Sequence, residues 1–256
     1  MNIKFNLNSI IKDWRWWSYV FILISLISSL IYGFYYCVLK EYWYVSETSI
    51  YASLLNYDAL MSFFSVQVTI ITIIWLLLFV IKSYRNQKKI ESDFQISVIN
   101  YNLLVFIIFW VGIIYSFANE KGFLENYSKN QVICTSITHF LLPTFLLVLY
   151  PFTSGNKYID FKKIFKEKTF YKTMIYPIFY LFYILVRGKI YQNDKASENS
   201  WPYDFLNFDK LLIGNSLFGY IILLVLVFFI WLILHHWLII SINNLIYKKR
   251  KKIEKS

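Results

Sequence analysis

The chain has 256 residues, of which 58% are hydrophobic and only 16% are charged. A soluble domain carries about 45–50% apolar and about 25% charged residues, so this composition excludes an ordinary soluble globular domain and indicates lipid as the main solvent. The formal net charge of +11 would fit a nucleic-acid binder only if a soluble domain were present to do the binding, and none is visible between the apolar segments.

Six segments are apolar over the roughly 20 residues that a helix needs to cross a bilayer. In chain order they are Trp16–Val38, Ala59–Ile81, Ile96–Ala118, Val132–Phe152, Phe170–Val186 and Leu211–Ile240. The first is too long for a signal sequence and lacks a small-residue cleavage site, so we expect a retained helix. The sequence thus predicts an all-α fold: a single membrane domain (1–256) built as a bundle of six transmembrane helices.

The basic residues are distributed unevenly over the connections between these segments. Of the 26 Lys and Arg residues, 19 fall in the N-terminus, the second connection, the fourth connection with the start of the fifth helix, and the tail 246–256. The positive-inside rule therefore predicts a cell-membrane protein with both termini in the cytoplasm. This distribution explains the net charge without nucleic acid, and it makes membrane lipids the expected partners.

The second segment carries a stripe of polar residues. Polar residues inside spans are costly, so they tend to face the protein interior and to mark a site. The members of the stripe are spaced three or four residues apart and so share one face of a helix: Asp58, Ser62, Ser65, Thr69 and Thr72. Gln67 lies off that face.

The fourth segment carries a second polar cluster, made of Thr135, Ser136, His139, Pro143 and Thr144. His139 is the histidine deepest inside a span, and no carboxylate lies deep in any span, which argues against a proton-relay pump. A single buried histidine without a nearby cysteine pair predicts no metal site, and we expect no cofactor.

With both termini inside, Ser65 and His139 each lie roughly 8–11 Å below the outer ends of their helices. A hydroxyl and an imidazole at one depth form the pair that activates an oxygen nucleophile. The competing interpretation is structural, because Ser and Thr in membrane helices often serve close packing and interhelical hydrogen bonds.

Four stretches resemble the prokaryotic six-transmembrane proteins related to the androgen-induced protein family. They are Phe63-Phe64-Ser65-Val66-Gln67, Thr138-His139-Phe140-Leu141-Leu142-Pro143, Tyr176-Pro177 with Tyr180 and Arg187-Gly188, and Trp201-Pro202-Tyr203-Asp204-Phe205-Leu206. Eukaryotic members of that family are membrane-embedded threonine hydrolases that cleave fatty acid esters of hydroxy fatty acids. The resemblance implies Ser65 as nucleophile in place of the family's threonine, and His139 as the catalytic histidine.

The sequence departs from the family's pattern after Gln67, where Val68-Thr69 replaces a common Ser-Asn. The aromatic-proline motif is also a residue shorter. Since the resemblance implies an activity only for the eukaryotic branch, hydrolysis by this chain is an analogy supported by one pair of residues.

Other residues complete the hypothesis. Asp58 is a candidate to orient His139, and Thr135, Ser136, Gln67 or backbone groups are candidates to stabilise an oxyanion. The loop after the fifth helix contributes Trp201, Tyr203 and Asp204, either as a lid or as an aromatic belt at the interface, and Asp204 is a candidate partner for Arg187.

Two functions follow from these residues. The first is an intramembrane lipid-ester hydrolase whose acyl-ester substrate arrives from the outer leaflet. The alternative is a non-enzymatic membrane protein, either a structural partner or a small-solute carrier. A carrier more often shows paired charges or glycine-broken helices in repeated halves, and the sequence displays neither.

Overall fold

The computed structural model describes residues 13–46, 48–86, 92–119, 122–166, 169–191 and 201–253. This part of the chain is all-helical. Six helical stretches are long and apolar enough to cross a membrane, namely Trp14–Lys40, Phe64–Ile81, Asp93–Asn119, Lys129–Thr153, Thr169–Tyr191 and Leu217–Ile253. The predicted all-α fold with six membrane-spanning helices is therefore confirmed.

Several spans are built from more than one helical element. The elements are α2 (Trp14–Phe34), π-helical η1 (Tyr35–Lys40), α3 (Ala52–Ser62), α4 (Phe64–Asn86), α5 (Ser92–Asn119), η2 (Phe123–Asn126), α6 (Lys129–Ser136), π-helical η3 (Ile137–Leu141), α7 (Leu142–Thr153), η4 (Phe161–Lys163), α8 (Thr169–Tyr191), η6 (Asp204–Leu206) and α9 (Leu217–Ile253).

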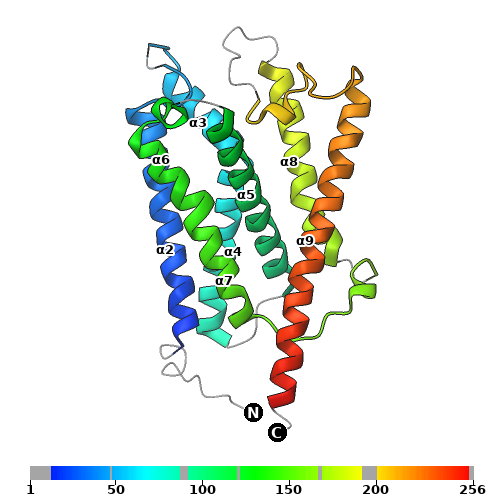
Figure 1. Cartoon of the computed structure of the whole chain (residues 1–256). Coiled ribbons are helices and arrows are strands. Elements are labelled where there is room, and N and C mark those ends of the chain that lie inside the picture. The colour runs from blue at the N-terminus through cyan, green and yellow to red at the C-terminus, as the bar shows by residue number, and fades with distance from the viewer. Residues whose placement is uncertain are drawn as a thin grey trace.

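Helix α5 lies at the centre of the bundle and contacts α4, α7, α8 and α9, while α2 packs against α4 and α7. The start of α2 and the end of α9 lie at the same end of the bundle, which we call the terminal end (Figure 1). Helix α3 and the segment that leads into α9 lie at the opposite, far end. Buried side chains such as Tyr19, Trp75 and Leu146 fill the core between the helices.

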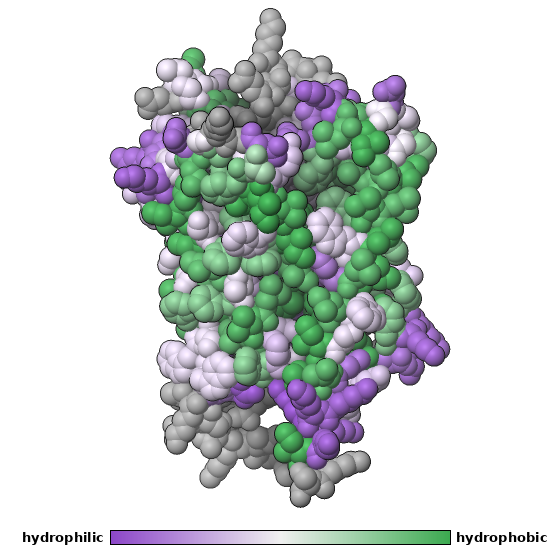
Figure 2. Space-filling model, viewed as in Figure 1, coloured by the Kyte–Doolittle hydropathy of each residue, from purple (hydrophilic) through white to green (hydrophobic). Residues whose placement is uncertain are grey.

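The face of the molecule shown in Figure 2 carries a broad hydrophobic band between hydrophilic groups at the two ends. Large apolar side chains of α9, including Phe218, Leu226 and Leu234, point outward and are exposed. Apolar patches of this extent are unusual on a soluble monomer, and they are the expected surface of helices in contact with lipid.

The second span differs from its prediction, because the helix expected over 59–81 is broken at Phe63. This residue has an extended backbone with φ −71° and ψ 130°, so α3 ends at Ser62 and α4 begins at Phe64. Two side chains satisfy carbonyl groups that the break releases: Gln67 Nε2 donates to the Met61 oxygen over 2.9 Å and the Tyr180 hydroxyl to the Ser62 oxygen over 3.0 Å. Such substitutes allow irregular backbone at membrane depth.

The last two spans also differ from their expected limits. Helix α8 is longer than the predicted 170–186 and continues through Pro177 to Tyr191. Helix α9 begins at Leu217 rather than at 211, because Gly214 has a left-handed φ of +72° and the Ser216 hydroxyl accepts from the Gly219 amide over 3.2 Å. As expected, α9 continues into the basic tail as far as Ile253, and residues 254–256 of that tail lie outside the described residues.

Candidate functional site

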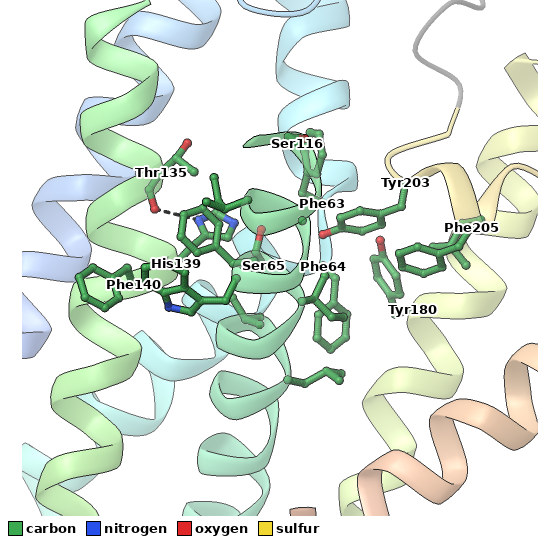
Figure 3. Close-up of a pocket in the computed structure, with 18 of the residues that line it drawn as sticks. Phe63, Phe64, Ser65, Ser116, Thr135, His139, Phe140, Tyr180, Tyr203 and Phe205 are labelled. Carbon is green, nitrogen blue, oxygen red and sulfur yellow. Dashed lines mark hydrogen bonds between the residues drawn. The ribbon is translucent and has the colours of Figure 1, made fainter. Parts of the chain in front are cut away.

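A cavity of about 670 Å³ lies in the half of the bundle nearer the far end, between α4, α5 and η3 on one side and α8, α9 and residues 203–206 on the other (Figure 3). Most of its wall is aromatic or aliphatic. The polar side chains that line it are those of Ser65, Ser116, Tyr127, Gln131, Thr135, Ser136, His139, Tyr180 and Tyr203.

The described hydrogen bonds between α5 and α8 lie in the terminal half of the bundle. There the Tyr101 hydroxyl donates to the Thr173 carbonyl oxygen over 2.7 Å, and the Ser97 and Thr173 hydroxyls lie 2.8 Å apart. Nearer the far end, α5 instead exposes Ile114 and Tyr115. Between the Thr173 contacts and the far end, the cavity occupies the space between α5 and α8.

Ser65 sits in the first turn of α4, directly after the break. Its side chain is buried, at 5% exposure, and its Oγ has no hydrogen-bond partner among the described residues. The other stripe hydroxyls are all engaged: Ser62 donates to Ala59 O, Thr69 to Ser65 O, and Thr72 to Val68 O. The structural interpretation thus accounts for Ser62, Thr69 and Thr72, whereas Ser65 is left with an unused hydroxyl.

His139 presents one ring nitrogen to the cavity. Its Nδ1 lies 3.1 Å from the Thr135 carbonyl oxygen and 2.9 Å from the Thr138 hydroxyl. A carbonyl oxygen only accepts, and the Thr138 hydroxyl already donates to Cys134 O over 2.8 Å, so Nδ1 carries the proton of the neutral ring. Nε2 is then the acceptor, and it hydrogen-bonds to no residue in the described ranges.

A local irregularity of the backbone accompanies His139. The residue lies in η3, whose wide turn is closed by a bond from the Leu142 amide to the Ile137 carbonyl oxygen. Pro143 follows and has no N–H to offer the His139 carbonyl group, which favours a departure from regular α-helix. Wide turns of this kind inside α-helices are frequent at functional sites.

Ser65 and His139 come from different spans and line the same cavity, and α4 contacts η3 directly (Figure 3). The two side chains do not hydrogen-bond to each other, since Ser65 Oγ has no described partner. The cavity therefore holds a hydroxyl and an imidazole nitrogen that are both unengaged and that share one space.

Asp58 does not orient His139. Its carboxylate accepts from Arg187 Nε over 2.9 Å, from Arg187 Nη2 over 2.6 Å and from the Tyr191 hydroxyl over 2.7 Å. The backbone of Thr135 holds the imidazole instead. The structure does not pair Arg187 with Asp204 as expected; among the described residues its ion pair is with Asp58.

Among the candidates for oxyanion stabilisation, Gln67 is already committed. Its amide nitrogen donates to Met61 O, and its Oε1 accepts from the Tyr176 hydroxyl over 3.2 Å. Thr135 and Ser136 do line the cavity. Gln67 therefore supports the helix break that positions Ser65.

The segment expected as a lid divides into three roles. Trp201 packs so closely on Gly188 that a Cβ there would lie 1.9 Å from its ring, and its indole nitrogen donates to Asp209 over 2.9 Å. Tyr203 lines the cavity, whereas Asp204 is exposed and is not part of the lining. The Arg187-Gly188 and Trp201–Leu206 stretches are thus in contact, which neither motif alone indicates.

Tyr203 is the group near Ser65 whose role the sequence did not reveal. Its ring contacts Phe63 edge-on and stacks on Phe205, with centroids 5.6 Å and 5.2 Å apart. Its hydroxyl points toward Ser65 (Figure 3). Burial raises the pKa of Tyr203 to about 12, although the nearby Ser65 hydroxyl and the amides of Ser65 and Phe64 act to lower it. The phenol is therefore protonated at neutral pH and acts as a donor.

Cys37 and Cys134 are both free thiols. Within the described ranges, no three His, Cys, Asp or Glu side chains gather as they would around a metal ion. The cavity itself holds a hydroxyl, an imidazole and hydrogen-bond donors in an apolar surrounding.

Comparison of the chain with protein-family models, with curated proteins and with solved structures finds no match.

Proposed function

We propose that this protein is an intramembrane ester hydrolase that acts on acyl-chain lipids. One observation carries the proposal: Ser65 and His139 face the same apolar cavity, each with its reactive atom unengaged by described residues. A buried hydroxyl without a partner costs stability, so its presence beside an acceptor imidazole favours a catalytic role.

In the proposed reaction Ser65 Oγ attacks the ester carbonyl carbon and its proton passes to His139 Nε2. Since the two residues do not hydrogen-bond in the structure, the transfer uses a bridging water or follows a small closure around the substrate. The tetrahedral intermediate then expels the alcohol, which takes the proton from Nε2, and water hydrolyses the acyl-serine with His139 again as base. The Thr135 carbonyl group holds Nδ1–H throughout and stabilises the imidazolium.

The shape of the cavity supports an acyl chain as substrate. Its wall includes Gly112 on α5, Ile178 on α8 and Val225 on α9, and all three are exposed on the side of the bundle. The cavity therefore communicates with the surface that faces lipid, and an apolar chain can enter between α5 and the pair α8 and α9 without crossing water. With the termini in the cytoplasm, as the basic residues favour, this opening lies in the outer leaflet.

A fluorophosphonate probe tests the proposal, since it reacts covalently with activated serine. We expect the purified, folded protein to be labelled, and labelling to disappear in Ser65→Ala and in His139→Ala. Ser62→Ala is the matched control, because the Ser62 hydroxyl already donates a hydrogen bond to the Ala59 carbonyl group. Equal labelling of wild type and Ser65→Ala would sink the proposal, and absence of labelling in all variants would favour a non-enzymatic membrane protein.

A further inference from the structure

The break at Phe63 leaves backbone donors beside Ser65. A helix cannot satisfy its own first amides, and here the N–H groups of Ser65 and Val66 have no backbone acceptor among the described residues. The Phe63 amide donates to Leu60 O over 3.4 Å, and the next amide with a described backbone acceptor is that of Gln67, which donates to Phe63 O over 3.2 Å. Of these two residues, Ser65 lines the cavity, and its amide lies there beside the Tyr203 side chain.

Two side chains mark the same spot. Ser65 Oγ is buried and unpartnered, and it points into the cavity between His139 and Tyr203 (Figure 3). The Tyr203 hydroxyl lies on the side of Ser65 opposite His139 and points toward Ser65 (Figure 3). The Ser65 hydroxyl and the amides of Ser65 and Phe64 are near enough to interact with it. Donors from the backbone and from a phenol thus converge on one point.

The electrostatics of this point favour an oxygen with negative charge. The N-terminus of the 23-residue α4 carries the positive end of the helix dipole, and free amides at such an end bind carboxylates and phosphates. The rest of the cavity wall is apolar and suits a hydrocarbon chain rather than a large polar headgroup.

We propose that the N-terminus of α4, together with Tyr203, binds the carboxyl group of a single-chain fatty acid, whose hydrocarbon tail lies in the aromatic cavity. This inference rests on the proposed function. The same donors would bind the ester carbonyl oxygen during the reaction and the carboxylate of the acyl product afterwards. Binding of the acid requires no turnover, so it can be measured separately.

The experiment compares oleic acid with oleyl alcohol as competitors of a fluorescent fatty acid on the purified full chain. We expect wild type to bind the acid more tightly than the alcohol, and Tyr203→Phe to reduce this preference by about tenfold with little change for the alcohol, since a hydrogen bond to a charged group is lost. Tyr183→Phe is the control, because Tyr183 lies on α8 but does not line the cavity.

Ser65→Ala separates the two proposals, because it removes the nucleophile and keeps the amides and Tyr203. We expect it to retain the preference for the acid even though hydrolysis is lost. Equal affinity of wild type for acid and alcohol would overturn the inference, as would a preference that Tyr203→Phe leaves unchanged. A preference for the acid without any hydrolysis would overturn the enzymatic proposal alone.

Discussion

The second span shows two kinds of polar residue on one face. Inside the regular part of α4, Thr69 and Thr72 donate to carbonyl groups one turn earlier, and Thr72 also accepts from Asn102 on α5 over 2.9 Å. At the break, the Ser65 hydroxyl has no described hydrogen-bond partner, and the Ser65 and Val66 amides have no backbone acceptor among the described residues. Hydroxyl side chains within the regular helix thus bond to its carbonyl groups, whereas the hydroxyl at the interruption has no described partner.

The largest effect is expected at Ser65 itself. Ser65→Ala removes the nucleophile, so ester hydrolysis should fall by about 10³-fold or more. The unfolding midpoint should stay the same or rise slightly, because a buried hydroxyl without a partner is removed. Ser65→Thr, which keeps a hydroxyl, should retain measurable activity. A loss of stability with intact hydrolysis would show that Ser65, like Thr69 and Thr72, has a structural role.

A substitution at Gly112 tests whether the acyl chain enters the cavity from the lipid side. A side chain built there meets no heavy atom within 4 Å, so Gly112→Phe should fold and project into the mouth of the cavity. We expect hydrolysis of long-chain esters to fall by about tenfold, because the chain can no longer occupy its path, while short-chain esters are affected less. Equal losses for both chain lengths would contradict lateral access.

Gly188 tests the placement of Tyr203. Gly188→Ala would force the Trp201 ring aside, which should cost about 1–3 kcal/mol of stability through overpacking and lower activity several-fold by shifting the attached segment. Gly112→Ala is the matched control, since it adds the same methyl group in open space. Comparable midpoints and rates for the two variants would show that the contact between Trp201 and Gly188 does not position the site.

The smallest effect on activity is expected at Thr72. Thr72→Val keeps the shape and removes the bond from Asn102, so the free energy of unfolding should fall by about 1 kcal/mol while hydrolysis is unchanged. Thr144→Val serves as control, because the Thr144 hydroxyl donates within its own helix, to Phe140 O. A marked loss of activity in Thr72→Val would remove the distinction between the two parts of the stripe.

The six spans were predictable, because length and hydropathy alone determine which segments suit a bilayer. The pairing of Ser65 with His139 as candidates came from helical spacing and depth. The break at Phe63 was not predictable, since neither Gly nor Pro marks it and it depends on Gln67 and Tyr180, the latter on a distant span. For the same reason the contact between Gly188 and Trp201 emerged only in three dimensions.

The orientation of the bundle also stays a prediction from charge. The structure places the start of α2 and the end of α9 on one side, as six spans require, without identifying that side as cytoplasmic (Figure 1). The distribution of charge, and not the packing between helices, carries this prediction.

Peptide mass spectrometry after fluorophosphonate treatment of the wild-type protein locates the adduct. We expect one modified serine, Ser65, in the peptide that spans the break between α3 and α4, and loss of that adduct in His139→Ala. An adduct on another serine, or an adduct on Ser65 that persists without His139, would contradict the proposal that this pair forms the reactive centre.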